Sequence, residues 1–350
     1  MGIQGFYSMF QHLQKTVGLD SLNGKWLIID GNFVIYKYGI GIRKMQAINN
    51  KRQADAKLSN HVFTVVYFSH MLMQRNIKPF WVFDGINVSD MKTKIITKRN
   101  DRITTSKEKL EEVEGEDYIK HYKKSLKITS DMYNECKHAL DLMGVAHMSA
   151  FGEADADCAM LSGVNNDICG VYTEDSDILM FGGECIFSGI DFETNTIKSI
   201  TKNDTFTYLK YLSGNVLTYE KYLKFMIIMG TDYCAGIKGI SKNVLFKFYI
   251  NCNMDTNEMF EKIRENKNKI TIDDTEYKLN YQRSLPMKID DIYQLYSNAT
   301  PEFDAVDIQT YLDTKKEPDI ERLKLFLTRC NFDKPFILNI IKNISDDRVV

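Results

Sequence analysis

The sequence has few of the residue patterns on which common metal and redox sites depend. Its seven cysteines form no CxxC pair, and its six histidines form no HExxH motif. A zinc site of the usual cysteine–histidine type is therefore excluded, and any metal must be held by oxygen ligands. The cysteines are odd in number and scattered, which is typical of reduced thiols rather than of a disulfide framework.

Signal-peptide and membrane-span patterns are also missing. The chain begins Met-Gly-Ile-Gln-Gly-Phe, without a basic region or a long apolar stretch, and Phe6 stands where a myristoylation signal needs Ser or Thr. The densest apolar run, Phe63–Met73, is interrupted by Ser69 and His70 and is too short to span a bilayer. We therefore expect an intracellular protein.

Proline is scarce, with five in 350 residues, and no linker, internal repeat or low-complexity tail is visible. The apolar fraction of 44% is that of an ordinary globular chain with ample core. We expect one domain spanning residues 1–350.

The net charge of −2 gives no sign of nucleic-acid binding, but the charges are unevenly distributed. Two basic segments flank the acidic run Glu111–Asp117. A charge run is usually only a solvated face, so its meaning depends on its surroundings. The basic residues are Lys92, Lys94, Lys98, Arg99, Arg102, Lys107 and Lys109, then Lys120, Lys123, Lys124 and Lys127.

Three apolar segments that end in an aspartate predict buried strands: Trp26–Asp30, Pro79–Asp84 and Ile168–Asp175. Helical patterns over Lys57–Arg75 and Asp131–Met143 alternate with them. This order predicts an α/β fold with a mostly parallel central sheet and helices on both faces. Ligands bind at the carboxyl ends of such strands, so three carboxylates should point to one place.

Further acids accompany these strand ends. Glu153 and Asp155 begin a predicted helix, Asp177 follows Asp175, and Asp232 follows an apolar stretch. Each has an ordinary explanation, because acids favour the first turn of a helix and aspartate favours turns. Together they suit two Mg²⁺ ions about 4 Å apart, the arrangement used to hydrolyse phosphodiesters. Without metal, such clustered carboxylates would repel one another.

These motifs resemble the flap endonuclease branch of the XPG-type 5′ nucleases over nearly the whole chain, from Met1 to about Ile344. The matching segments occur in the family's order: Ile29-Asp30, Val82-Phe83-Asp84-Gly85, Glu135-Cys136-Lys137-His138, Leu142-Met143-Gly144, Gly152-Glu153-Ala154-Asp155-Ala156, Thr173-Glu174-Asp175-Ser176-Asp177 and Gly230-Thr231-Asp232-Tyr233-Cys234.

The resemblance implies a PIN-like nuclease core with two Mg²⁺ ions per active site, Mn²⁺ being an alternative. It implies that Asp155 contacts both ions. The expected metal ligands are Asp30, Asp84, Glu153, Asp155, Asp175, Asp177 and Asp232.

It also implies a helical arch over the active site, at residues 90–129, through which a 5′ single strand passes. Lys92 and Arg99 correspond to the basic pair that engages the scissile phosphate, and seven residues place both on one helix face. Here the segment before Lys92 carries one extra residue, and the proline usual after Phe-Asp-Gly is absent. Tyr36 would stack on a base, a contact that tolerates any sequence.

The remaining regions implied are an N-terminal nuclease region at 1–105, an internal one at 130–250 and a helical C-terminal part at 251–350. A helix-turn-helix-type duplex anchor, with a bound K⁺, would occupy 232–250. Its glycines permit close approach of backbone amides to phosphate, although Ser241 replaces a third glycine. The expected DNA-binding residues are Gly2, Tyr36, Gly236, Lys238, Gly239 and Lys242.

The expected function is therefore a 5′ flap endonuclease of DNA replication and repair. We expect it to act on branched DNA, in the nucleus, another DNA-containing compartment or a viral replication site. The segment Asn49–Asp55 is nearly free of acids, so a requirement for a 3′ flap is left open. No QxxLxxFF-type motif follows residue 344, so no sliding clamp is expected. We expect a monomer.

Three alternatives remain open at this point. A 5′–3′ exonuclease of the same family fits Thr173–Asp177 equally well. A PIN-like ribonuclease would share the acidic sheet end but not the arch or the anchor. An inactive DNA-binding scaffold would have no need of seven carboxylates.

Overall fold

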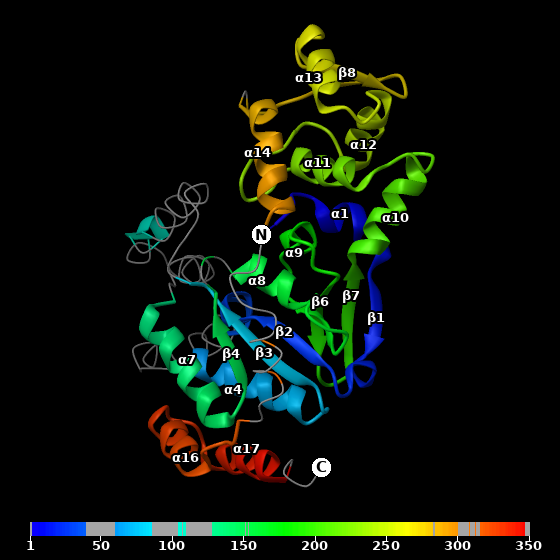
Figure 1. The fold of residues 1–350 in the computed structure, drawn as a ribbon. Helices are drawn as coiled ribbons and strands as arrows, with labels where there is room; N and C mark the ends of the chain where they lie inside the picture. Colours follow the sequence, from blue (N-terminus) through cyan, green and yellow to red (C-terminus); the bar gives the residue numbers. More distant parts are fainter. Residues whose placement is uncertain are drawn as a thin grey trace. The chain divides into compact units, whose positions relative to one another are not determined.

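A computed structural model describes residues 2–39, 60–85, 104–106, 108–109, 128–150, 152, 154–282, 284–299, 308, 312 and 316–346 (Figure 1). The chain packs into two compact units and passes between them several times. Unit 1 contains Met1–Gly18, Cys158–Gly163 and Gly170–Pro301, and unit 2 contains Leu19–Asp157, Val164–Cys169 and Glu302–Val350. These boundaries do not follow the regions expected from the sequence, which remain a prediction.

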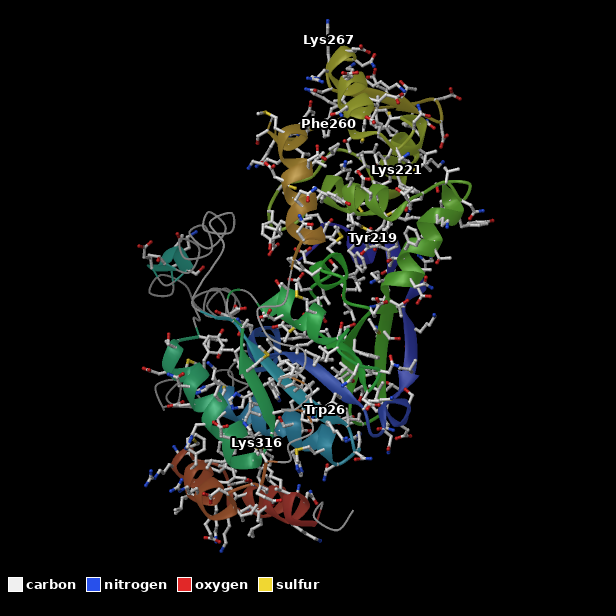
Figure 2. The ribbon with its side chains drawn as sticks, in the orientation of Figure 1. Trp26, Tyr219, Lys221, Phe260, Lys267 and Lys316 are labelled. Carbon is white, nitrogen blue, oxygen red and sulfur yellow. The ribbon has the colours of Figure 1, made fainter. Side chains whose placement is uncertain are left out.

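Three parallel strands lie at the centre of unit 2, in the order β2 (Trp26–Asp30), β3 (Lys78–Phe83) and β4 (Ala146–Ser149). Both β2 and β3 are buried on both faces, as their unbroken apolar sequences predict. Trp26, labelled in Figure 2, begins β2 and donates its backbone N–H to Asp167, just before β5 (Ile168–Tyr172). Gly31 follows β2, and an added Cβ there would lie 2.7 Å from the Phe83 ring.

The helices α4 (Asn60–Met73) and α7 (Ser130–Met143) pack against each other in unit 2. Thr129 caps α7 by accepting a hydrogen bond from the N–H of Met132, and the helix ends at Gly144 in the left-handed conformation. The C-terminal helices α16 (Ile320–Arg329) and α17 (Lys334–Asp346) pack on α7 and α4, respectively.

Unit 1 contains β5, which begins in unit 2, followed in spatial order by β6 (Cys185–Asp191), β7 (Thr196–Thr201) and β1 (Lys15–Gly18). β5 and β6 are parallel, whereas β7 is antiparallel to β6 and β1. The predicted mostly parallel sheet is therefore confirmed, with an antiparallel part that the apolar pattern did not predict.

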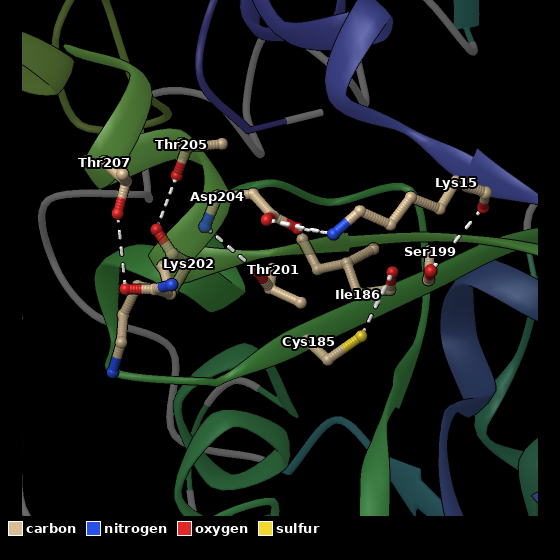
Figure 3. A network of polar contacts seen from close by, with 10 residues as sticks. Lys15, Cys185, Ile186, Ser199, Thr201, Lys202, Asp204, Thr205 and Thr207 are labelled. Carbon is tan, nitrogen blue, oxygen red and sulfur yellow. Dashed lines mark hydrogen bonds and ion pairs between the residues drawn. The ribbon is translucent and has the colours of Figure 1, made fainter. Parts of the chain in front are cut away.

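A polar network joins β1 and β7 to α10 (Lys202–Leu212), the helix that follows β7 (Figure 3). The Nζ of Lys15 lies 3.0 Å from both carboxylate oxygens of Asp204. The hydroxyl of Thr201 caps α10 by accepting from the N–H of Asp204 at 3.0 Å. These contacts fasten the edge strand β1 to the body of unit 1.

Beyond Thr218, unit 1 is mostly helical, as expected. The helix α11 (Tyr219–Met229) is buried over most of its surface and forms the core of this part. Phe260, labelled in Figure 2, is buried and contacts the ring of Tyr281. The other helices here are α12 (Lys242–Asn251), α13 (Thr256–Glu265) and α14 (Leu285–Ser297), and a hairpin of β8 (Lys269–Ile272) and β9 (Thr275–Lys278) was not predicted.

Short helical turns complete the described chain: α1 (Phe6–Phe10), η1 (Gln11–Leu13), η2 (Leu19–Leu22), α2 (Gly31–Val34), η3 (Ile35–Gly39), α8 (Ala154–Leu161) and α9 (Asp177–Met180). Of the helices in the described ranges, none has both the length and the apolar character needed to cross a membrane.

Candidate metal and nucleic-acid site

Two predicted metal ligands of unit 2 lie at neighbouring strand ends. Asp30 is the last residue of β2 and is buried, and Asp84 directly follows β3. In the parallel register Asp30 lies opposite Val82, so both carboxylates leave the strands at the same edge. One oxygen of Asp30 accepts from the N–H of Phe33 at 2.9 Å, which caps α2.

Two donors orient the Asp84 carboxylate. Its Oδ1 accepts from the backbone N–H of Ala154 at 3.0 Å, and its Oδ2 accepts from the side-chain amide of Asn32. The amide oxygen of Asn32 is buried and has no hydrogen-bond partner among the described residues. The sequence analysis missed Asn32, although a polar residue just after an apolar strand was a usable signal.

An unpartnered buried oxygen beside a carboxylate suits an ordered water of a hydrated metal ion, because such polar atoms otherwise incur a desolvation cost. The structure therefore fits the oxygen-ligand ions Mg²⁺ and Mn²⁺ at this edge. Asp155 lies in the first turn of α8, one residue after the Ala154 that binds Asp84. Glu153, Lys92 and Arg99 lie outside the described residues.

A tyrosine that the sequence analysis did not select lies beside this pair. Burial is the main cause of a raised pKa of the Tyr133 phenol. Tyr36, Asp84 and Asp30 raise this pKa further, which places all three close to the phenol. Tyr133 also contacts the ring of Phe83 edge-on, with centroids 6.0 Å apart. The stacking of Tyr36 on a base stays a prediction.

Asp175 and Asp177 follow β5 in unit 1, and both are buried. The Oδ1 of Asp175 accepts from the N–H of Asp177 at 3.0 Å. The Oδ2 of Asp177 accepts from the hydroxyl of Tyr296 at 3.0 Å. Burial raises the pKa of Tyr296, so this phenol remains a proton donor to the carboxylate at neutral pH.

The start of the chain packs against Asp175 and its neighbour Ser176. The N–H of Ile3 donates to the hydroxyl of Ser176 at 2.8 Å, and Gly2 has a φ of +85°. A Cβ on Gly2 would lie 2.4 Å from the Oδ1 of Asp175. Tyr7 donates to the carbonyl of Glu174 at 3.3 Å. Gly2 therefore lies at a predicted metal ligand, and its contact with DNA stays a prediction.

Asp232 lies in a loop between α11 and α12, and its side chain is partly exposed. The N–H of Thr231 donates to the carbonyl of Cys234 at 3.0 Å, which closes the tip of the loop. The ring of Tyr233 packs against that of Tyr296, with centroids 5.6 Å apart. Tyr296 therefore connects Asp177 with the loop in which Asp232 lies.

The duplex-anchor residues also lie in unit 1. Lys238 and Gly239 are exposed, and the backbone of Lys238 pairs with that of Asn280. Gly236 is buried. The ammonium of Lys242 points at main-chain carbonyls, which the sequence analysis did not anticipate.

Within the described ranges, no three or more histidine, cysteine or acidic side chains are close enough to hold one metal ion. The structure brings Asp30 together with Asp84, and Asp175 together with Asp177. The six described carboxylates are divided equally between the two units, and the seventh is Glu153. The complete set of ligands therefore stays a prediction.

Replacing Asn32 with alanine should weaken Mg²⁺ affinity by roughly 10- to 100-fold, because Asp84 would lose a donor that orients its Oδ2. Isothermal titration calorimetry of the protein without DNA measures this. Asn298→Ala is the matched control, since that exposed amide bonds to Gln294 on its own helix turn and to no acid among the described residues. Equal Mg²⁺ affinity in both variants would contradict a positioning role for Asn32.

Comparison with known proteins identifies the family and related folds. The family model of the XPG N-terminal domain matches residues 1–106, and that of the XPG I-region matches residues 144–232. Proteins named Flap endonuclease 1 are 28% identical in Theileria annulata, 26% in Plasmodium falciparum and 27% in Homo sapiens. These alignments cover 70%, 100% and 69% of this chain, and 49%, 53% and 63% of the relatives. The chain thus spans about half the length of the first two relatives.

Solved structures share the fold. The catalytic core of Rad2 in complex with DNA substrate aligns with a TM-score of 0.65 and 22% identity, covering 98% of this chain and all of that one. The flap endonuclease-1 of Methanococcus jannaschii aligns with a TM-score of 0.63 and 18% identity, covering 95% of each chain. At these identities the likeness concerns the fold. The two family-model matches together cover more than half of the sequence, and the chain belongs to the XPG family.

Proposed function

We propose that this chain is a structure-specific 5′ flap endonuclease that hydrolyses a DNA phosphodiester near the junction of single strand and duplex. The observation that carries the proposal is the pairing of carboxylates after parallel strands, of which Asp30, Asp175 and Asp177 are buried. Asp84 and Asp177 are each held by donors from distant parts of the chain. The relatives named Flap endonuclease 1 support the choice of reaction.

The residues proposed to hold two divalent ions are acids, which suit Mg²⁺ or Mn²⁺. When bound, such ions lower the pKa of an attacking water and neutralise charge on the scissile phosphate. Asn32 and Tyr296 keep two of the carboxylates in a fixed orientation. The ligands proposed are Asp30, Asp84, Glu153, Asp155, Asp175, Asp177 and Asp232.

The other proposed roles concern the DNA. Lys92 and Arg99 would stabilise negative charge on the phosphate during the reaction. Tyr36 would stack on a base next to that phosphate, and Lys238 and Gly239 would contact the duplex backbone through their exposed positions. The products would be 5′-phosphate and 3′-hydroxyl ends. The K⁺ expected at the duplex anchor stays a prediction.

We place the activity in DNA replication and repair, in a compartment that holds DNA, with branched DNA as the partner. A monomer that works without a sliding clamp is the simplest form of this proposal. A 5′–3′ exonuclease of the same family would use the same carboxylates, so the choice between them depends on the products.

The deciding experiment compares two end-labelled DNAs of the same sequence, one with a 5′ flap and one with a recessed 5′ end. Both are incubated with Mg²⁺, and EDTA serves as the control. We expect one oligonucleotide cut at the flap base and no product in EDTA. A ladder of mononucleotides from the recessed end would favour the exonuclease. Binding without cleavage of either DNA would contradict the proposed reaction.

A further inference from the structure

Lys242 is a largely buried lysine whose partners are carbonyls rather than acids. Its Nζ donates to the backbone carbonyl of Met229 at 2.6 Å and to that of Ile237 at 3.3 Å. No carboxylate pairs with it among the described residues. Its methylene groups pack against Gly5, where a Cβ would lie 3.0 Å from the Lys242 Cγ. The side chain is therefore directed into unit 1 and held along its length.

The two carbonyls flank the loop that carries Asp232. Met229 is the last residue of α11, and Ile237 follows the loop on its other side. The backbones of Met229 and Gly236 meet where the loop begins and ends, which we call its neck. A Cβ on Gly236 would lie only 2.2 Å from the carbonyl carbon of Met229. The N–H of Ile237 also donates to the carbonyl of Ile228 at 2.9 Å. Lys242 thus bridges both sides of a closed loop.

Lysine is an unexpected residue at this position. Lys242 is the first residue of α12, where the positive end of the helix dipole disfavours a cation. Burial lowers the pKa of Lys242 to about 8, and the charge of Lys238 contributes. The compensating interaction is with the carbonyl that ends α11, since a helix C-terminus carries unsatisfied carbonyls and partial negative charge.

We propose that Lys242 is a positioning residue for Asp232, its ammonium serving as a tethered cation that holds the neck of this loop closed. The inference rests on the proposed function, in which Asp232 is a metal ligand. Clusters of main-chain carbonyls are also sites that K⁺ occupies in proteins. Because the ammonium already takes this place, the loop needs no free monovalent cation, and Lys242 would replace the K⁺ that the resemblance implied for the duplex anchor.

Hydrogen exchange of the protein alone tests this without requiring cleavage. In Lys242→Met we expect the amides of residues 230–237 to exchange at least about tenfold faster, in choline chloride, while the other helices of unit 1 keep their protection. Replacing choline with K⁺ should restore part of this protection. Lys247→Met, which removes an exposed ammonium from the same helix, is the matched control and should change nothing in this loop.

Cleavage kinetics give a second test, because a merely structural role of Lys242 would not change kcat, Mg²⁺ affinity and the KM for DNA in this pattern. Lys242→Met should lower kcat and weaken Mg²⁺ affinity with little change in the KM for DNA, and K⁺ should partly restore both. Wild-type protein should show equal loop protection in K⁺ and in choline, a measurement that needs no variant to fold.

Unchanged exchange in Lys242→Met would overturn the inference. So would a loss of loop protection in the wild type when K⁺ is withdrawn, because a free cation would then hold the neck. Lack of flap cleavage by the wild type would instead overturn the proposed function, leaving the exchange result to be judged by itself.

Discussion

Replacing Asp175 with alanine is expected to lower the single-turnover rate of flap cleavage by roughly three orders of magnitude or more, while DNA binding changes little. Asp175 is buried, its Oδ1 accepts from the N–H of Asp177, and Gly2 lies against it. Alanine would remove a proposed ligand and also a partner that holds Asp177. Quenched-flow cleavage in Mg²⁺ and fluorescence anisotropy in Ca²⁺ separate the two effects.

Asp291→Asn is the matched control for this experiment. Asp291 is an exposed acid on α14, and its neutralisation changes the net charge of the protein by the same amount. It should cleave at the wild-type rate. Normal cleavage by Asp175→Ala would refute the assignment of this carboxylate to the metal site, whereas equal losses in both variants would indicate a general effect of charge.

Replacing Gly2 with alanine is expected to lower flap cleavage by about a hundredfold, the cost of displacing a catalytic group by about 1 Å. The new Cβ would lie 2.4 Å from the Oδ1 of Asp175 and 2.7 Å from the N–H nitrogen of Ser176, so the carboxylate must move. The φ of +85° adds backbone strain of about 1–2 kcal/mol. Single-turnover kinetics and thermal unfolding measure the two costs.

Gly24→Ala separates strain from displacement. Gly24 has a φ of +76°, but an added Cβ there would have no neighbour within 4 Å among the described residues. This variant should lose similar stability and keep full activity. If both variants cleave normally, contact with the chain start does not determine the position of Asp175.

The sequence predicted the places of three acids that depend on local pattern, whereas their role as metal ligands stays a prediction. Asp30 ends β2, and Asp84 and Asp175 follow β3 and β5; each was predictable because an apolar run followed by an acid is visible in one short window. The resemblance extended this to Asp232, and both family-model matches confirm the family.

The residues that hold the carboxylates could not be predicted in this way. Tyr296 and Asp177 are 119 residues apart in the chain, and Asn32 and Asp84 are 52 apart. Such pairs exist only once the tertiary fold has formed. The strand β8 alternates between exposed and buried residues over only four positions, which is too short for its pattern to stand out.

Lys92, Arg99 and Glu153 lie outside the described residues, and their roles rest on the resemblance. Lys242 is the opposite case: the resemblance implied a DNA contact, whereas its environment in the structure suggests an internal role. The direction of a flexible side chain depends on neighbours such as Gly5 that are far away in sequence.

The order in which the ribosome makes the chain has a consequence for unit 2. Its helices α4 and α7 are synthesised long before α16 and α17, which cover them. Phe63 stacks on Phe332 and Phe336, so its ring has no such cover until these residues emerge. Unit 2 should therefore complete its folding only after α16 and α17 have emerged, and a nascent chain released before then would expose this aromatic surface to chaperones.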